Sequence, residues 1–362
     1  MSKPRLIAFY LPQFYPTKEN DEWWQKGFTE WTNVGNAKPL FKGHYQPRVP
    51  ADLGYYDLRI PEVREQQADM ARRAGIEGFC YWHYWFAGRR LLDRVFSEVV
   101  ASGKPDYPFC LCWANHSWYQ KTWDSSKPDR LLIEQTYPGV QDYVDHFNAM
   151  LPAFKDQRYM KVKGRLLFGI YNPLGMSQEE FLLFSSTWNE LAREHHLEGF
   201  EFFGFSFHAE EYHEIIARGF SHVTYDCVME MLKTSSLLSN VAKRIWRSLT
   251  KIPNKVYDYQ QYVDYAVDHF DFSQSMYPCL NPNFDHSPRS ANRGFILHHS
   301  TPQKWGRFCS RAFDQSSGRP HEENLVFIKA WNEWGEGNYL EPDLKYGKAY
   351  LEALKEAYHT CK

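Results

Sequence analysis

The 362-residue sequence predicts a (β/α)8 barrel, and three observations support this fold class. Short runs rich in β-branched and aromatic residues recur along the chain, separated by amphipathic stretches with helical period. Continuous apolar strands that alternate with helices are typical of a parallel sheet covered on both sides. Eight such runs occur, which favours a closed barrel over the alternative of an open doubly wound sheet. The first run is also followed by no Gly-x-Gly-x-x-Gly, and the sequence contains no phosphate-binding loop.

The elements follow in order from the N-terminus. The first apolar run, RLIAFYLP, is too short for a signal peptide or for the ~20 residues of a membrane span, so the chain is expected to start directly with a strand. The predicted strands cover 5–12, 78–85, 109–116, 165–172, 200–208, 221–228, 274–281 and 324–332. The clearest helices cover 61–75, 140–155, 177–195 and 342–358, with Pro342 at a first-turn position in the last. The whole chain, 1–362, is therefore expected to be one barrel domain.

Two long insertions interrupt this pattern. Residues 13–57 follow the first strand, are rich in Trp, Tyr and Phe, and are expected to form a loop at the active-site rim, since loops of this length in compact domains are usually functional. Residues 229–273 are expected to be a helical insertion. Within it, 233–255 carries six basic residues, no acidic residue and an apolar stripe. Two interpretations are open: a lid helix packed on the barrel, or a contact with an anionic partner such as a lipid-linked or phosphorylated glycan.

Composition excludes several classes of function. The net charge is −2, so no basic field is present that would bind nucleic acid through its phosphates. The seven cysteines form no paired CxxC sets, which predicts neither a zinc site nor a disulfide framework and fits reduced thiols in the cytoplasm. No apolar window is long enough for a transmembrane segment. Aromatic residues make up 17% of the chain, more than a core needs, and indicate a surface that binds flat ligands such as sugars.

Two glutamates at the end of the eighth predicted strand are the best candidates for catalysis. The segment AWNEWGEGNYLEP (330–342) places Glu333 and Glu336 three residues apart, flanked by Trp331 and Trp334. The reactive groups of (β/α)8 enzymes lie at the C-terminal ends of the strands. Glycosidic chemistry needs two carboxyl groups with different tasks, and an apolar tryptophan wall raises the pKa of the one that donates a proton. Paired glutamates on an exposed turn are usually only solvated, but tryptophans on both sides favour the catalytic interpretation.

The expected substrate site is an aromatic-walled, net acidic groove formed by the 13–57 insertion and the strand ends. The residues expected to bind substrate are Tyr10, Trp24, Trp31, His83, Trp85, Asn115, His116, Trp118, Asp285, Arg289, Trp331 and Trp334. A metal-dependent hydrolase is the rival interpretation, but the chain contains no His-x-His and no Asp-x-Asp. No metal and no cofactor are therefore expected.

Several motifs, in order along the chain, resemble one known family. They are YLPQFYPTKENDEWWQKGFTEWTNVGNAKPLFKGHYQPRVPADLGYYDLR, GFCYWHYWF, FCLCWANHSW, LLIEQ and AWNEWGEGNYLEPD. They resemble the WbsX-type family, named as glycosyltransferases of polysaccharide (O-antigen or capsule) gene clusters and described as similar to glycoside hydrolase family 99. The resemblance runs from about residue 5 to residue 358 and itself implies a (β/α)8 barrel.

The resemblance also implies roles for the two glutamates. Family 99 enzymes are retaining endo-α-mannosidases, and their pair of glutamates looks like the pair here, with Glu333 as the base acting on the sugar 2-hydroxyl and Glu336 as the general acid/base. The chain departs from the pattern twice. Gly335 stands where family 99 commonly has His, and His116 stands where WbsX-type proteins usually have Glu. If His116 lay near Glu333 or Glu336, its pKa would rise, and the site would suit an acidic sugar or a phosphate.

The expected function is cleavage or transfer of a glycosidic bond in a bacterial polysaccharide by a paired-glutamate mechanism, with an oligosaccharide or polysaccharide as the substrate. Two alternatives remain open: a glycosyltransferase that uses an activated sugar donor, and a non-catalytic glycan-binding barrel. The presence of both glutamates, with the tryptophans near them in the sequence, argues against a non-catalytic barrel.

Overall fold

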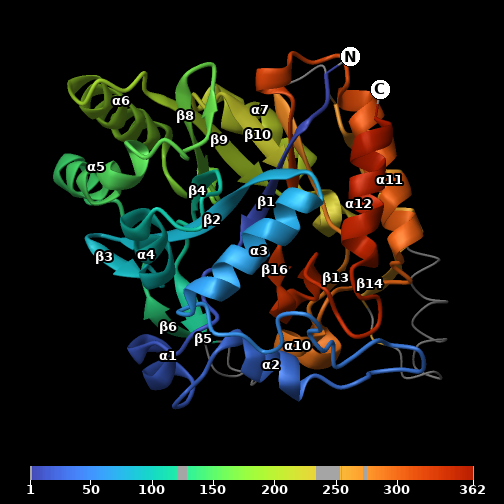
Figure 1. Ribbon diagram of the computed structural model, residues 1–362. Coiled ribbons are helices and arrows are strands. Elements are labelled where there is room, and N and C mark those ends of the chain that lie inside the picture. Colours follow the sequence, from blue (N-terminus) through green and yellow to red (C-terminus); the bar gives the residue numbers. More distant parts are fainter. Residues whose placement is uncertain (1, 121–128, 234–252, 254, 272–274, 362) are drawn as a thin grey trace.

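Eight parallel strands close into a barrel in the computed structural model, which describes residues 2–120, 129–233, 253, 255–271 and 275–361 (Figure 1). The strands are β1 (Arg5–Tyr10), β2 (Ile76–Phe86), β4 (Phe109–Trp113), β8 (Arg165–Ile170), β9 (Phe200–Ser206), β10 (His222–Tyr225), β12 (Met276–Leu280) and β15 (Leu325–Ile328). Consecutive strands pair in parallel, and the ring closes because β1 bonds to both β2 and β15. The predicted (β/α)8 barrel and all eight predicted strands are confirmed.

A helix follows each barrel strand and covers the outside of the ring. These helices are α3 (Pro61–Arg73), α4 (Arg94–Ser102), α5 (Val140–Phe154), α6 (Gln178–Glu194), α7 (Tyr212–Ala217), α9 (Tyr259–His269), α11 (Pro302–Ser316) and α12 (Ala349–Thr360). The predicted helices at 61–75, 140–155 and 177–195 are confirmed as α3, α5 and α6. The prediction that the last helix begins near Pro342 was wrong. Asp343 Oδ1 instead accepts the backbone N–H groups of Lys345 and Tyr346, which turns the chain before α12 begins.

Local sequence signals explain where the helices begin. At the start of α6, Ser177 Oγ accepts the N–H of Glu180 at 3.1 Å and the Glu180 carboxylate accepts the N–H of Ser177 at 2.7 Å, a reciprocal capping box. At α11, Thr301 caps the helix through the N–H of Lys304, and a proline occupies the first helical position. These caps satisfy N–H groups that have no partner within the helix.

Alternate residues of the strands point into the barrel and out to the helices. Phe9 points inward, where its ring stacks on Trp82 at 4.6 Å and on Phe327 at 5.2 Å. Tyr10, its neighbour, points outward and donates its hydroxyl to Gln67 of α3 at 2.6 Å. Because successive side chains of a strand lie on opposite faces, this parity decides which residues near each strand end can reach the site.

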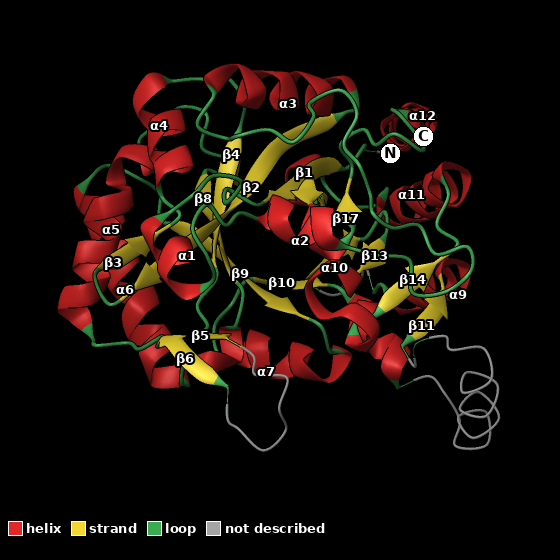
Figure 2. Ribbon diagram, turned by 90° about the horizontal axis from the view of Figure 1, so that it is seen from below, coloured by secondary structure: helices red, strands yellow, loops and turns green. Residues whose placement is uncertain are grey.

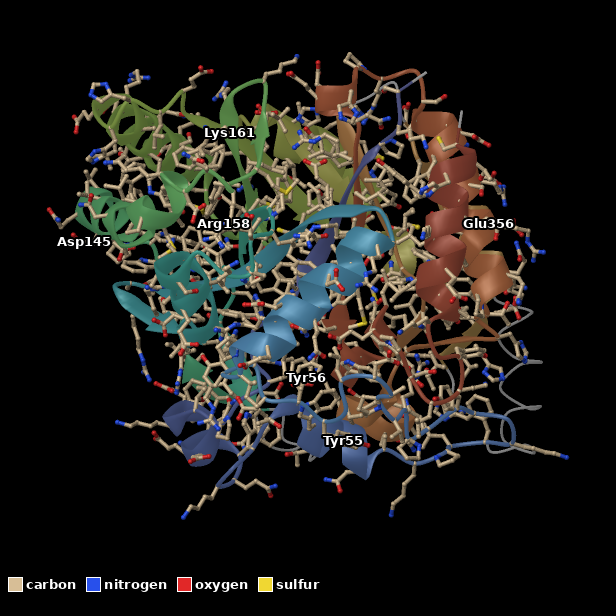
Figure 3. All side chains as sticks on the ribbon, in the orientation of Figure 1. Tyr55, Tyr56, Asp145, Arg158, Lys161 and Glu356 are labelled. Carbon is tan, nitrogen blue, oxygen red and sulfur yellow. The ribbon has the colours of Figure 1, made fainter. Side chains whose placement is uncertain are left out.

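The 13–57 insertion covers the C-terminal end of the barrel strands. It contributes α1 (Lys18–Trp23) and α2 (Glu30–Asn36), which lie across this end together with the short α10 (Ser287–Ser290) (Figure 2). Short strands pair around the barrel as β2–β3 (Arg89–Leu91), β5 (Trp118–Gln120)–β6 (Arg130–Ile133), β7 (Lys161–Val162)–β8, β11 (Val256–Asp258)–β14 (Ile296–His298)–β13 (Phe284–Asp285) and β16 (Asn332–Glu333)–β17 (Asn338–Tyr339). Figure 3 shows Tyr55 and Tyr56 of the insertion at one end of the molecule and Lys161 toward the other.

The 229–273 insertion is described only at its two ends. A 3-10 turn covers Cys227–Leu232, and β11 and α9 follow from Val256. The apolar stripe and most of the basic residues of 233–255 lie outside the described residues, so the lid and anionic-partner interpretations both stay predictions. Within the described ranges, no helix combines the length and apolar character needed to cross a bilayer. All seven cysteines are buried, unpaired thiols.

Candidate active site

Glu333 and Glu336 lie on a tight hairpin that directly follows barrel strand β15. Strand β16 ends at Glu333, a 3-10 turn covers Trp334–Glu336, and β17 returns antiparallel to β16. Asn332 fastens the hairpin to the end of β1, since its side-chain amide accepts the N–H of Leu11 at 2.8 Å and donates to the carbonyl of Leu11 at 3.1 Å. The hairpin therefore holds both glutamates at the C-terminal end of the barrel, as predicted for catalytic groups.

Arg289 of α10 joins three carboxylates at this site. Its Nη1 donates to Glu336 Oε1 at 2.6 Å and lies 3.6 Å from Glu333 Oε1, while its Nε donates to Glu30 Oε2 at 3.1 Å. Glu30 comes from α2 in the 13–57 insertion, and only 7% of its surface is exposed. One guanidinium thus brings together the insertion, the loop after β12 and the hairpin that carries Glu333 and Glu336.

Lys329, directly after β15, places a second cation on Glu336. Its Nζ lies 3.5 Å from Glu336 Oε2 and over the ring of Phe207, at 5.2 Å from the ring centre. Lys329 is only 5% exposed. A buried ammonium is costly unless it is paired, so the carboxylate of Glu336 is its necessary counter-charge.

The two glutamates have opposite protonation preferences. Burial and the charge of Glu336 raise the pKa of Glu333 above the ordinary value of a glutamic acid. Burial also opposes ionisation of Glu336, but the charges of Lys329 and Arg289 outweigh it and lower the pKa of Glu336. A proton shared by the pair is therefore favoured on Glu333 and the negative charge on Glu336, next to Lys329 and Arg289. This is the reverse of the distribution that the family 99 resemblance implies.

Two buried carboxylate oxygens at this site, Glu333 Oε2 and Asp226 Oδ2, have no hydrogen-bond partner among the described residues, and Glu336 Oε2 has only the ion pair with Lys329 at 3.5 Å. Asp226 follows β10, is fully buried and is influenced by the charges of both Lys329 and Glu336, which puts it in the same cluster. Buried polar atoms are nearly always hydrogen-bonded, so unpartnered acceptors gathered in one place indicate where a ligand or water binds. A sugar, with several hydroxyl donors, matches this set.

Three of the predicted aromatic residues pack near the glutamates, although Trp334 is only 1% exposed and so is buried rather than lining an open groove. The rings of Trp31 and Trp334 lie 5.6 Å apart, and Trp334 stacks on Tyr339 at 3.7 Å. Trp118 packs against Tyr84 of β2 at 5.2 Å. Burial raises the pKa of Tyr84, and the charge of Glu333 adds to this effect, so this tyrosine faces the site.

Four predicted substrate-binding residues are instead packed between the barrel and its helices. Tyr10, His83, Trp85 and Trp331 are each at most 5% exposed. His83 shares a hydrogen bond of 2.7 Å with His146 of α5, and the ring of Trp85 stacks on His146 at 4.6 Å. Their predicted place in a groove was wrong, because Tyr10, His83 and Trp85 occupy outward-facing positions of their strands and Trp331, between β15 and β16, packs on Phe79 at 5.3 Å.

Two other predicted residues have structural partners that use their polar atoms. Asn115 donates to the carbonyl of Asn172 and accepts its N–H, which ties the ends of β4 and β8 together. Asp285 is fully buried and accepts hydrogen bonds from Gln46 Nε2 and from the ring of His44, both at 2.8 Å. Asp285 therefore fastens the insertion to the loop after β12, rather than lying open to a substrate at the rim as predicted.

Among the described residues, neither of the two remaining predicted residues, His116 and Trp24, forms a hydrogen bond or an ion pair with Glu333 or Glu336. His116 packs beside Tyr171 at 5.1 Å, and burial lowers its pKa. The condition for the hypothesised increase in its pKa is not met, because within the described structure no carboxylate lies within ion-pair distance of this ring. Trp24 is 46% exposed at the end of α1 and stacks on Phe28 at 5.6 Å.

Sequence reasoning did not single out Glu30 and Lys329 as site residues. Lys329 carried a usable signal, since a lysine in the otherwise apolar run NLVFIKAWN must be buried with a partner. Glu30 carried none, because nothing in the insertion distinguishes it from neighbouring acidic residues.

A second acidic group lies at the ends of β9 and β10. His208, Glu210 and Glu230 have ligand atoms close enough to hold a metal ion. However, the ammonium of Lys233 lies 2.6 Å from Glu210 Oε1 and 3.3 Å from Glu230 Oε1, so both carboxylates already form ion pairs with a lysine.

Comparisons with known proteins give one family match and two related sequences. The family model described as "Glycosyltransferase WbsX" matches residues 6–354. "Uncharacterized protein WxcX" of Xanthomonas campestris pv. campestris strain B100 is 34% identical over 360 residues, which are 97% of this chain and 49% of that protein. The chain therefore spans about half the length of the curated relatives it matches.

Solved structures show the same fold. The GH99 endo-α-mannosidase of Bacteroides thetaiotaomicron in complex with bis-tris-propane superposes with a TM-score of 0.60 at 13% identity, over 99% of this chain and 97% of that one. A "glycoside hydrolase-like protein" superposes with a TM-score of 0.59 at 15% identity, over 99% of this chain and 94% of that one.

Proposed function

The chain belongs to the WbsX glycosyltransferase family, and from its site we propose that it cleaves or transfers a glycosidic bond with Glu333 and Glu336 as the reacting carboxyl groups. The observation that carries the proposal is the cluster of unpartnered, buried carboxylate oxygens around one arginine and one lysine. The proposed substrate is a glycan of the bacterial polysaccharide type, because the family is one of carbohydrate-active enzymes.

The opposite pKa shifts of the two carboxyl groups support this proposal. Glu333, whose raised pKa favours the protonated form, donates its proton to the oxygen of the leaving sugar. Glu336, which is ionised, acts on the other side of the bond as a base or nucleophile. Arg289 and Lys329 keep Glu336 charged and also hold it in place.

The contacts of Arg289 support retention of configuration. A single Nη1 atom lies 2.6 Å from Oε1 of Glu336 and 3.6 Å from Oε1 of Glu333, so these two oxygens lie closer together than the ~6.5–9.5 Å typical of inverting pairs. Inverting enzymes need that space for a water between the carboxyl groups. We therefore propose the retaining arrangement for this pair.

Incubation with polysaccharide alone and with polysaccharide plus nucleotide-sugars, followed by product analysis, tests the proposal. Shorter products from polymer alone indicate hydrolysis, and extension that requires the added donor indicates a transferase. Glu333→Gln and Glu336→Gln should each lower turnover by roughly 10²–10⁴ while glycan affinity is retained. Glu356→Gln on the exposed face of α12 is the matched control and should leave turnover unchanged (Figure 3).

An activated substrate identifies the proton donor. A glycoside with a good leaving group needs no protonation, so it should restore turnover in Glu333→Gln but not in Glu336→Gln. Rescue of Glu336→Gln alone would reverse the two roles. Glycan binding with no turnover of any substrate would favour the non-catalytic alternative.

A further inference from the structure

A cavity of about 240 Å³ with polar, charged and apolar walls lies beside the catalytic hairpin and takes no part in the proposed chemistry. Its walls come from the 13–57 insertion, from β14, from the start of α11 and from the turn before α12. Three cationic side chains line it, one from each of three separate segments: Arg48, Lys304 and Lys345. Segments far apart in the sequence thus bring positive charge to a single cavity.

Arg48 is the buried base of this cavity. It is 7% exposed, and its Nη1 donates to Asn283 Oδ1 at 2.5 Å and to the carbonyl of Gly337 at 2.8 Å. Its Nε is buried without a hydrogen-bond partner in the described part of the chain. A buried guanidinium N–H without an acceptor is unusual. This N–H is itself inaccessible, so the charged donors that an anion in the cavity can reach are the ammonium groups of Lys304 and Lys345.

Lys345 is the more accessible cation. Its Nζ lies over the rings of Tyr45 and Tyr346, at 4.5 Å and 4.8 Å from their centres. Among the described residues, no carboxylate lies within ion-pair distance of this ammonium. Lys304 is only weakly paired, with Asp258 at 3.8 Å. Two ammonium groups therefore face the cavity with little or no counter-charge.

The acidic side chain that lines the cavity in the described structure, Asp285, is the counter-charge of Arg48, whose Nη2 lies 3.7 Å from Asp285 Oδ2, and it forms no ion pair with Lys304 or Lys345. It already accepts hydrogen bonds from His44 and Gln46, and the neighbouring charges hold its pKa at about 2 despite burial. The N-terminal end of the 15-residue helix α11, capped by Thr301, adds a favourable dipole for an anion at the same wall.

From this arrangement we infer that the cavity binds a phosphate or carboxylate group. The volume lies below the roughly 300 Å³ at which pockets for drug-sized ligands begin, so the group is small. Arg48 contacts the backbone of Gly337, the residue after Glu336, so the anion would lie next to the catalytic hairpin. That the anionic group belongs to an acidic or phosphorylated sugar of the substrate glycan rests on the proposed function. That the cavity binds an anion does not.

Isothermal titration calorimetry with inorganic phosphate, glucuronate and glucose, at constant ionic strength, tests the inference. Phosphate or glucuronate should bind and glucose should not; the stronger of the two anions identifies the group. Lys345→Met should weaken anion binding at least about tenfold, because it removes a charged donor. Lys304→Met should weaken it in the same direction and serves as the second variant if Lys345→Met does not fold. Lys348→Met is the matched control, since Lys348 pairs with Asp52 at 2.8 Å and does not line the cavity.

Three results would overturn the inference: no binding of either anion, equal binding of glucose, or equal loss in Lys348→Met. The titration should be repeated with Glu333→Gln, whose anion binding should match that of the wild type. If anions bind but no glycan is cleaved or extended, the proposed function fails and this inference stands. If glycans react but no anion binds, the inference alone fails.

Discussion

Replacement of Arg289 by methionine tests whether the site is held together by one guanidinium. The change leaves Glu30, Glu333 and Glu336 without their shared partner, while Lys329 still lies 3.5 Å from Glu336. Breaking a buried ion pair by removing one partner costs roughly 3–5 kcal/mol. The side chain of Arg289 is 22% exposed and one cation remains, so the loss should fall at the lower end, about 3 kcal/mol.

Urea unfolding at neutral pH, monitored by tryptophan fluorescence, measures this loss. Arg73→Met is the matched control, because Arg73 forms an exposed pair with Asp69 and should contribute less than about 1 kcal/mol. The effect should also depend on pH. The pKa of Glu336 is lower in the folded protein than in the unfolded chain, where it is about 4.3. Its ionised side chain therefore adds to the free energy of unfolding above that pH, and this contribution is lost as the pH falls through the folded-state pKa. The difference between wild type and Arg289→Met should therefore shrink in acid. A loss at neutral pH no larger than that of Arg73→Met would refute the reasoning.

Three further predictions concern other buried groups. Glu341→Leu should lower both stability, by about 1–3 kcal/mol in urea unfolding, and kcat, because the indole N–H of Trp334 loses its acceptor at 2.6 Å. Burial lowers the pKa of both His83 and His146, so their contribution to stability is present above about pH 6.5 and is lost below it. The melting temperature of the wild type should therefore decrease between pH 7 and pH 5 by more than that of the double variant in which both histidines are replaced by Leu. The raised pKa of Glu333 should move the alkaline limb of kcat above the ordinary glutamate value of about 4.3, and Glu333→Gln should abolish that limb in a pH–rate profile.

The fold could be predicted because its signal is repeated. Each barrel strand is a short apolar run followed by a helical period, and an error at one boundary leaves the other seven units intact. The late start of α12 is an example: Asp343 closes a turn through backbone N–H groups, which a hydrophobic pattern does not reveal, yet the topology is unaffected.

The orientation of side chains at the strand ends could not be predicted in the same way. A strand buried on both faces has no alternation of apolar and polar residues, so the sequence does not show which parity faces the barrel axis. His83 and Trp85 were expected in the groove, whereas the intervening Tyr84 faces Glu333. The error is one of register, and it affects neighbouring residues of one strand together.

The departure at Gly335 shows how distant segments complete this site. The resemblance to family 99 implies a histidine between the two glutamates, and its absence suggests an open space. The structure fills that space, because a Cβ atom at position 335 would collide with the carboxylate of Glu30 and approach Arg289 Nε to 2.9 Å. Glycine is therefore required where the insertion delivers Glu30 to the hairpin. The site thus adds a third carboxylate, that of Glu30, to the two glutamates that the resemblance implies. Arg289 pairs with both Glu30 and Glu336, which lie about 300 residues apart in the chain.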